Sequence, residues 1–245
     1  MLKDLGVTAA GDIDIEAIAY HVGAFIKYRP LEGCEGRIVG VDDRAIITID
    51  NRAIPTRRRF SAAHELGHWN YHRGRSLVCR SDEIGNPATG PLDPERVADG
   101  YAADLLMPRY LFGPMASQIG KATFKAVEDL RRKFNTSITA TAIRLVEYGP
   151  EPAMLVCHAA NGRRWFSRPP HIPDKWFPRN DLDADSYAMD VLHGKAERTR
   201  RVLMGADAWF DRWDAQKYEL YEETCSTTDD EVLTLLVFKD DEMLD

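Results

Sequence analysis

Two histidines and a glutamate stand close together in the segment His64-Glu65-Leu66-Gly67-His68. If this segment is helical, His64 and His68 lie on one face, one turn apart. Two imidazole nitrogens can then reach one metal ion at the distance of about 2.0–2.1 Å that zinc prefers. Glu65 is rotated by about 100° around the helix from His64, which suits a general base that acts on a water. The spacing therefore predicts a hydrolytic metal site.

A motif of five residues also occurs by chance, and two histidines on a helix can simply be surface or core residues. Here the motif lies inside a stretch, from about residue 59 to residue 73, that the surrounding pattern independently predicts to be helical. Phe60, Ala63 and Tyr71 keep helical spacing, and no proline interrupts them. Gly74 can end the helix. We therefore prefer the metal-binding interpretation.

A catalytic zinc site takes three protein ligands and leaves one position for water. Glu95 begins the next predicted helix, with Asp93 as its N-cap and Pro94 at its first position. A short connection brings Glu95 to the histidine pair and leaves Asp99, one turn later, to accept a hydrogen bond from a ligand histidine. The alternatives are a Glu95 that only favours the helix dipole and an Asp99 on a solvated helix surface. Two histidines and one glutamate favour zinc over manganese or iron, with one ion per chain.

A zinc ion lowers the pKa of its bound water to about 7, so Glu65 is expected to take the proton during attack on a peptide carbonyl. Glu65 then delivers this proton to the leaving amine. The oxyanion needs a donor besides the metal. Tyr71, His72 and Tyr101 are the candidates, and the sequence does not choose among them. His72 follows His68 by four residues, but a packed or capping histidine at the helix end is the simpler interpretation.

The other elements predict an α+β fold. The pattern of expected elements changes from mainly helices to mainly hairpins at Gly149-Pro150-Glu151-Pro152, where we place a domain boundary. We expect a mainly helical zinc-peptidase domain with a small β-sheet over residues 1–112. A helix-turn-helix-like segment follows over residues 113–149, and a small C-terminal α+β domain over residues 150–245. The expected elements are a helix (12–28), a hairpin (37–41 and 45–49), a loop (75–91), two helices (124–134 and 138–148), a second hairpin (153–158 and 163–167), a helix (184–192) and a closing hairpin (217–225 and 231–238).

The composition is that of an ordinary globular protein, with 44% hydrophobic residues and a net charge of −7. This charge argues against a protein coated in basic surface for nucleic acid. Residues 121–147 carry six basic and three acidic side chains, a balance of +3, so direct DNA binding stays open. It is disfavoured against a structural helix pair. The sequence does not begin like a secretory signal, and no apolar run approaches about 20 residues, so we expect a cytoplasmic protein with no membrane partner. The four cysteines are far apart, which predicts reduced thiols.

Two blocks of the sequence resemble the ImmA/IrrE family of metallo-endopeptidases. Residues 59–68, RFSAAHELGH, are similar to the family's zinc helix. Residues 95–108, ERVADGYAADLLMP, are similar to its Glu-x-x-Ala-Asn-x-Phe-Ala…Leu-Leu-Met-Pro signature, whose glutamate is the third ligand. Asp99 stands where the family usually has Asn, and Tyr101 where it has Phe. Other zinc peptidases with a glutamate ligand use Asp there to orient a histidine, so the departure does not argue against activity.

The resemblance covers about residues 10–148 and implies site-specific proteolysis by a zinc enzyme. The implied substrate is a helix-turn-helix repressor or an antitoxin-like partner, in transcription regulation or a stress response. It also implies a sensor-like or substrate-docking role for the C-terminal domain. The alternative is a regulatory protein that keeps the metal-peptidase fold and acts by binding a repressor or DNA. A pure binding module has no need of Glu65, which favours the enzyme.

Overall fold

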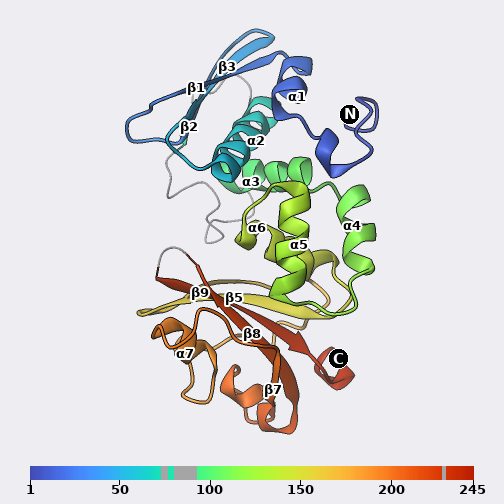
Figure 1. Ribbon diagram of the computed structural model, residues 1–245, viewed down its shortest axis with the longest axis vertical. Coiled ribbons are helices and arrows are strands. Elements are labelled where there is room, and N and C mark those ends of the chain that lie inside the picture. The colour runs from blue at the N-terminus through green and yellow to red at the C-terminus, as the bar shows by residue number, and fades with distance from the viewer. Residues whose placement is uncertain (73–76, 80–92, 228–229) are drawn as a thin grey trace. The chain divides into compact units, whose positions relative to one another are not determined.

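The computed structural model describes residues 1–72, 77–79, 93–227 and 230–245, and the chain divides into two compact units (Figure 1). The N-terminal unit consists of Met1–Phe112 with Arg131–Ser137, and the C-terminal unit of Gly113–Leu130 with Ile138–Asp245. Each unit has its own β-sheet, and helices dominate the middle of the chain. The predicted α+β class is therefore confirmed. No helix among the described residues is long and apolar enough to cross a membrane.

The N-terminal unit packs helices onto a sheet with the strand order β1–β3–β2–β4. β1 runs parallel to β3, and the other neighbours are antiparallel, so the predicted hairpin of residues 37–41 and 45–49 is confirmed. One face of this sheet is buried, with Ala45, Ile47 and Ile49 almost fully covered, and α2 packs against β2 and β3. The elements of this unit are α1 (Ile15–His21), β1 (Ala24–Arg29), β2 (Gly36–Val41), β3 (Arg44–Asp50), α2 (Pro55–Tyr71), β4 (Leu77–Cys79) and α3 (Pro94–Leu106).

The expectation of one helix over residues 12–28 is wrong beyond residue 21. α1 ends at His21, and β1 begins at Ala24. Gly23 separates them with φ +81°, a conformation that L side chains rarely adopt. A Cβ atom at Gly23 would lie 2.4 Å from the backbone oxygen of Asp43. The chain therefore turns at this glycine, and the apolar residues after it pair with β3 instead of continuing the helix.

The helix that carries the histidines is longer at its start than predicted. α2 begins at Pro55, four residues before the expected start, because proline at the first helical position loses no hydrogen bond. It ends at Tyr71 with His72 as its C-cap. The expected stop at Gly74 lies outside the described residues. So does most of the expected loop over residues 75–91, of which Leu77–Cys79 form β4.

The helices after this region match the sequence more closely. Asp93 caps α3 as expected, because its side chain accepts a hydrogen bond from the backbone N–H of Glu95 at 2.9 Å. α5 (Phe124–Phe134) and α6 (Ile138–Tyr148) have the predicted bounds. α4 (Arg109–Ser117) was not predicted, and Pro114 lies inside it although proline is disfavoured in a helix interior. α4 and α5 each have residues in both units.

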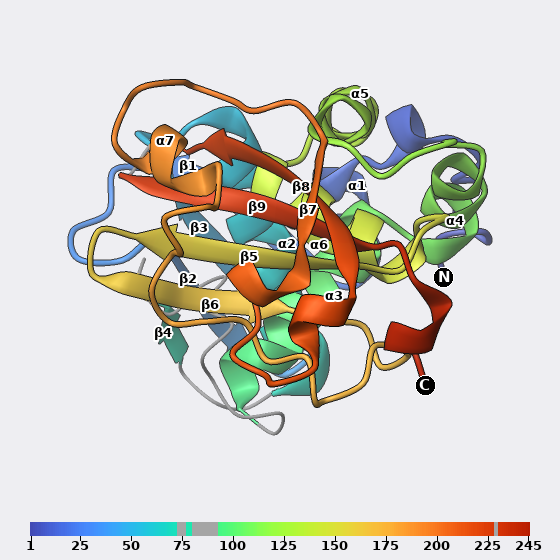
Figure 2. The ribbon, with the colours of Figure 1, turned by 90° about the horizontal axis from the view of Figure 1, so that it is seen from below.

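The C-terminal unit is built on an antiparallel sheet with the strand order β6–β5–β9–β8–β7 (Figure 2). Both predicted hairpins are confirmed, while the expected helix over residues 184–192 is shorter and covers only α7. α6 packs against β5, and Trp176, Trp209 and Phe210 join the sheet in one buried cluster. The elements of this unit are β5 (Ala153–Ala159), β6 (Gly162–Ser167), α7 (Ala188–Leu192), β7 (Val202–Gly205), β8 (Glu219–Ser226) and β9 (Glu231–Phe238).

α2 and α3 lie unusually close to each other in the N-terminal unit. A Cβ atom at Gly67 would come within 2.8 Å of the Ala98 Cα atom. Ala63, Ala98 and Ala102 are fully buried, so small residues occupy both helices. Because no bulky side chain separates the two backbones, the carboxylate of Glu95 on α3 can reach residues of α2.

We predict that Gly67→Ala separates the two helices. The added methyl group meets backbone rather than a flexible side chain, so relief requires movement of α3. We expect a loss of about 1–3 kcal/mol in the free energy of unfolding of the metal-free protein, typical of overpacking. Chemical denaturation measures this loss, and a chelator competition should show weaker zinc binding.

Gly100→Ala is the matched control, because Gly100 is an exposed residue of α3 whose added Cβ atom meets nothing within 4 Å. It should leave zinc affinity unchanged and raise stability by up to about 1 kcal/mol. Equal stability and zinc affinity of Gly67→Ala and wild type would refute the close-packing argument.

Candidate metal centre

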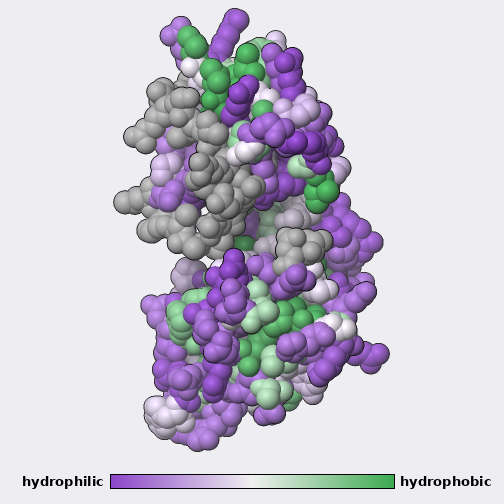
Figure 3. Space-filling view, turned by 90° about the vertical axis from the view of Figure 1, so that its left-hand side faces the viewer, coloured by the Kyte–Doolittle hydropathy of each residue, from purple (hydrophilic) through white to green (hydrophobic). Residues whose placement is uncertain are grey.

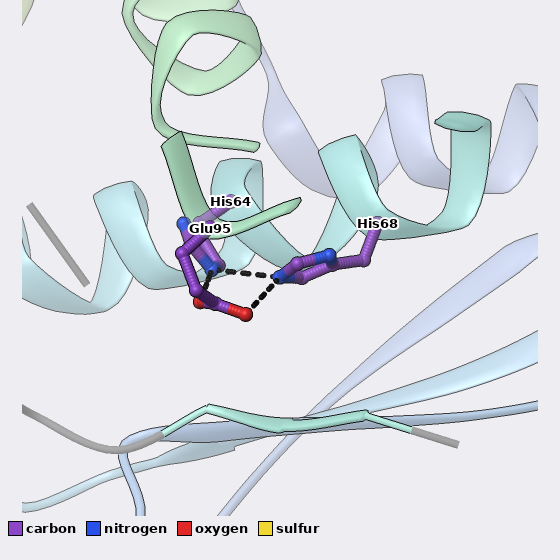
Figure 4. Close-up of side chains that lie close together, drawn as sticks. All are labelled: His64, His68 and Glu95. Atoms are coloured by element: carbon purple, nitrogen blue, oxygen red, sulfur yellow. Dashed lines mark hydrogen bonds and ion pairs between the residues drawn. The ribbon is translucent and has the colours of Figure 1, made fainter. Parts of the chain in front are cut away.

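Three side chains from two helices converge on one point in the N-terminal unit. His64 and His68 project from α2, and Glu95 projects from the first turn of α3 (Figure 4). The His64 Nε2 atom lies 3.0 Å from the His68 Nε2 atom. The Glu95 carboxylate lies 3.1 Å from His64 Nε2 and 3.3 Å from His68 Nε2. The three residues that the sequence singled out as ligands are therefore brought together.

The spacing of these ligand atoms fits a small divalent cation. Ligands at about 2.0–2.1 Å in a tetrahedral arrangement lie roughly 3.3 Å from one another, close to the observed separations. All three atoms lie within 4.8 Å of one another, and they form the one such group of His, Cys, Asp and Glu residues among the described parts of the chain. The donor set of two imidazoles and one carboxylate suits a metal that activates water.

The charges at the centre favour a compact cluster even without a metal. Burial opposes a charge on His64, but hydrogen bonds to Asp99 and Glu95 outweigh it and raise the pKa of the imidazole to about 9. Burial also opposes the charged form of Glu95, yet its hydrogen bonds to both histidines hold its pKa below the ordinary value. A cation at this point would meet a carboxylate that is already charged.

Each ligand histidine uses its other ring nitrogen for a contact outside the cluster. The Nδ1–H group of His64 donates to the Asp99 carboxylate at 2.8 Å. The His68 Nδ1 atom lies 3.1 Å from the His72 Nδ1 atom, and the two rings are tilted at a centroid distance of 5.2 Å. Such contacts hold the ring orientation and leave Nε2 for the metal. Asp99 and His72 therefore lie where they can orient the two imidazoles.

Glu65 is fully buried beside the ligand cluster and against the sheet. Burial is the largest influence on the pKa of His64 and lowers it, whereas the hydrogen bonds to Asp99 and Glu95 raise it. The negative charge of Glu65 makes a smaller contribution that also raises this pKa. A Cβ atom at Gly36 on β2 would lie 2.5 Å from the Glu65 Oε1 atom. The absence of a side chain at Gly36 thus provides the room in which the carboxylate lies. Sequence analysis missed Gly36, although a glycine inside a strand often marks a close approach.

The remaining candidate residues form a separate aromatic group. The Asn70 side-chain amide donates to the Tyr101 hydroxyl at 2.9 Å and to the Leu66 carbonyl at 2.8 Å. Tyr71 is largely exposed and meets the Tyr101 ring edge-on at a centroid distance of 5.8 Å. Burial raises the pKa of Tyr101, which keeps its hydroxyl protonated. Asn70 was not singled out from the sequence, since an asparagine on a helix carries no signal by itself.

The fold and the ligand set define a metallopeptidase-like domain, and the comparison with known families agrees. The IrrE N-terminal-like domain, also called peptidase M78, matches residues 19–146, which is more than half of the chain. The chain belongs to this family of metalloproteases. The resemblance of its two sequence blocks to the ImmA/IrrE family is therefore confirmed, together with His64, His68 and Glu95 as a metal-binding triad.

Two individual proteins are similar to this chain. The radiation response metalloprotease IrrE of Deinococcus radiodurans is 25% identical over 186 residues, which cover 73% of this chain and 51% of that protein. The chain thus spans about half the length of this curated relative. A solved structure of a Mycobacterium tuberculosis transcriptional regulator covers 97% of this chain and 73% of its own, with a TM-score of 0.61 and 14% identity. This second likeness shows a shared fold.

We predict that Asp99→Ala and His72→Phe each lower zinc affinity by about 10–100-fold, because each removes the acceptor that orients one imidazole. Phenylalanine keeps the ring and its packing, so it isolates the hydrogen bond. Competition with a fluorescent chelator measures the affinity. Thermal unfolding of the metal-free variants checks that each one folds.

His21→Phe is the matched control, since His21 is exposed at the end of α1. It should bind zinc as wild type does. His72→Asn, which offers an amide oxygen as acceptor, should recover part of the affinity lost in His72→Phe. Wild-type affinity in His72→Phe would show that His68 needs no such partner.

Proposed function

We propose that this chain is a zinc-dependent endopeptidase that cleaves a protein partner. The observation that supports this most is the convergence of His64, His68 and Glu95 beside a buried Glu65. A site that only binds a metal needs the three ligands but no further carboxylate next to them. Membership of a metalloprotease family supports the same reaction.

Each residue has one role in this proposal. His64, His68 and Glu95 hold the metal, and Asp99 orients His64. When bound, zinc supplies a Lewis acid that lowers the pKa of water to about 7 and polarises a peptide carbonyl. Glu65 takes the proton of the attacking water and passes it to the leaving amine. Tyr71, His72 and Tyr101 are the candidates for the hydrogen-bond donor that stabilises the oxyanion.

The proposed substrate is a transcriptional repressor of the helix-turn-helix type or an antitoxin-like protein, and its cleavage relieves repression. This proposal rests on the family resemblance and on the names of the similar proteins, a radiation response metalloprotease and a transcriptional regulator. We propose that residues 113–149 form a helix-turn-helix-like segment and that residues 150–245 sense a signal or dock the substrate. Direct DNA binding is disfavoured.

We predict that Glu65→Gln abolishes cleavage while zinc stays bound, because glutamine cannot accept the proton of the attacking water. The purified chain is incubated with a repressor encoded beside its gene, with and without a chelator, and fragments are identified by mass spectrometry. Bound zinc is quantified in parallel. Glu197→Gln, an exposed glutamate of the C-terminal unit, is the matched control and should cleave normally.

Two results would contradict the enzymatic function. One is a Glu65→Gln variant that retains the full biological effect in cells. The other is an intact repressor in the presence of zinc together with a stable complex between the two proteins. Either result favours the alternative, a regulatory protein that keeps the metallopeptidase fold and acts by binding.

We also predict that Gly36→Ala lowers the cleavage rate by about tenfold or more, equivalent to at least ~1.4 kcal/mol in the activation barrier. The new methyl group displaces the Glu65 carboxylate, which lies 2.5 Å from its position. The zinc content should remain one ion per chain, since the ligands lie on other elements. Gly100→Ala is the control, because its added methyl group meets no neighbour, and it should cleave normally. Gly33→Ala is unsuitable as a control because Gly33 has a φ of +74°. A normal cleavage rate in Gly36→Ala would show that the Glu65 carboxylate does not need the room at Gly36.

A further inference from the structure

The N-terminal sheet has an outer face, opposite the face that packs on α2, with two ordered rows of side chains. Phe25, Ile46 and Val39 stand side by side on β1, β3 and β2, since Phe25 pairs with Ile46 and Val39 pairs with Ile46. Their exposed fractions are 42%, 43% and 59%, which is high for large apolar residues. The upper part of Figure 3, which shows one side of the N-terminal unit, likewise has hydrophobic patches beside hydrophilic ones.

The next row along the same strands is basic. Lys27 pairs with Thr48, and Arg37 pairs with Thr48, so the hydroxyl-bearing residue lies between two cations. Arg29 lies two residues beyond Lys27 on the same face. These four residues line one pocket, and Leu31, Pro30 and Ile46 complete its walls. The apolar row and the basic pocket share Ile46 and are therefore continuous.

Within the part of the chain that the structure describes, the cations of this pocket have no acidic partner. Among the described residues, no ion pair involves Lys27, Arg29 or Arg37, although all three are charged and exposed. Asp50 lies at the same end of β3, but it pairs with Arg52 at 2.8 Å. Hydrogen bonds from Arg52 lower the pKa of Asp50 to about 2, so Asp50 is charged and held by Arg52.

The carboxylates near the pocket are held by other partners. Glu32 pairs with Arg52 at 3.4 Å, and Glu35 pairs with Arg57 at 2.6 Å. Arg52 also donates to the Leu31 carbonyl, which fixes the loop that walls the pocket. Asp50 and Glu32 share Arg52, so one of these carboxylates keeps an uncompensated charge. Lys27, Arg29 and Arg37 outweigh it, which leaves a local excess of positive charge among the described residues of a chain whose net charge is −7. The complementary ligand carries carboxylates or other anionic groups.

The spacing of the two rows selects an extended peptide as the ligand. Residues two apart on a strand are separated by roughly 6.6 Å, and this is also the spacing of side chains on one face of an extended peptide. A peptide that lies along the strands can place an apolar side chain on the first row and a carboxylate on the second. A nucleic-acid backbone has no apolar groups to cover Phe25 and Val39, and three cations are a small footprint for it.

We propose that the outer face of the N-terminal sheet, through Phe25, Ile46, Val39, Lys27, Arg29 and Arg37, docks an extended segment of the protein substrate in which acidic and apolar residues alternate at two-residue spacing. This inference rests on the proposed function, since it assigns the docked segment to the substrate. It adds a recognition surface that lies apart from the metal ligands, on the other side of the sheet from α2.

The test measures binding without cleavage, so that it is independent of catalysis. The full chain carrying Glu65→Gln is titrated against a fluorescein-labelled peptide with the repeat Leu-Ser-Glu-Ser, and fluorescence polarisation is recorded. A second peptide has Gln in place of each Glu. Two further probes compete for the site: inorganic phosphate and a duplex DNA of 20 base pairs.

Charge reversal at single positions assigns the binding to the pocket. Lys27→Glu and Arg37→Glu should each weaken binding of the acidic peptide by roughly tenfold, and Phe25→Ser by a similar factor. Lys3→Glu is the matched control, because Lys3 is an exposed lysine of the same unit that lies outside the sheet. It should change the affinity less than twofold. Thermal unfolding confirms that these surface variants fold.

Three results would overturn the proposal. An equal loss in Lys3→Glu and Arg37→Glu would mean general electrostatic attraction. Equal binding of the Gln peptide would mean apolar adhesion without charge recognition. Tighter binding of the DNA duplex, or displacement of the peptide by phosphate at low millimolar concentration, would mean a phosphate site. Because no step depends on cleavage, an inactive wild-type enzyme would refute the proposed function and leave this result standing.

Discussion

The close contact between α2 and α3 is the constraint on which the metal centre depends. Gly67 and Ala98 let the two backbones approach, and a single methyl group at Gly67 would bring side chain and Cα atom to 2.8 Å. At this distance the Glu95 carboxylate can meet two Nε2 atoms of α2 at 3.1 and 3.3 Å. The ligand geometry is thus set by packed helices rather than by mobile loops, which is the arrangement that preorganises a site.

The two ligand histidines are oriented by partners of different charge. Asp99 is a carboxylate, so it adds negative charge beside His64 and makes that imidazole a stronger base. His72 meets His68 through a ring nitrogen, which fixes the ring without adding a full negative charge. Asp99 stands where the family usually has Asn, so this chain places more charge behind one ligand than the family pattern does. The other ligand depends on the end of α2, where His72 is the C-cap.

The metal site was largely predictable from the sequence because its ligands obey helical spacing. His64 and His68 follow from a period of four, and Glu95 follows from its place in the first turn of a helix whose Asp93 and Pro94 signal the start. The surrounding contacts were not predictable in the same way. Gly36 meets the site through the packing of β2 on α2, and His72 through the end of α2. A glycine in a strand and a histidine four residues after His68 are local signals, but neither one says which side chain it will meet.

The errors in the fold have a similar origin. The apolar spacing after residue 12 fits a helix through residue 28, and only the pairing of Phe25 with Ile46, a tertiary contact, makes it a strand. Gly23 was the local signal, since a glycine inside a helical pattern can end it. α4 differs in the opposite direction, since it is a helix with Pro114 in its interior, where proline is disfavoured.

Strand β2 links the Glu65 carboxylate, the proposed general base, to the proposed docking face. Its residues alternate, so that Gly36, Ile38 and Gly40 face α2 while Arg37, Val39 and Val41 face outward. On the inner side, Gly36 leaves room for Glu65 and Gly40 for the Trp69 ring. A slip of one residue in the pairing of β2 with β3 would turn Arg37 toward Glu65 and bury the outer row. The register of this hairpin therefore determines both the room for the Glu65 side chain and the exposure of the basic pocket.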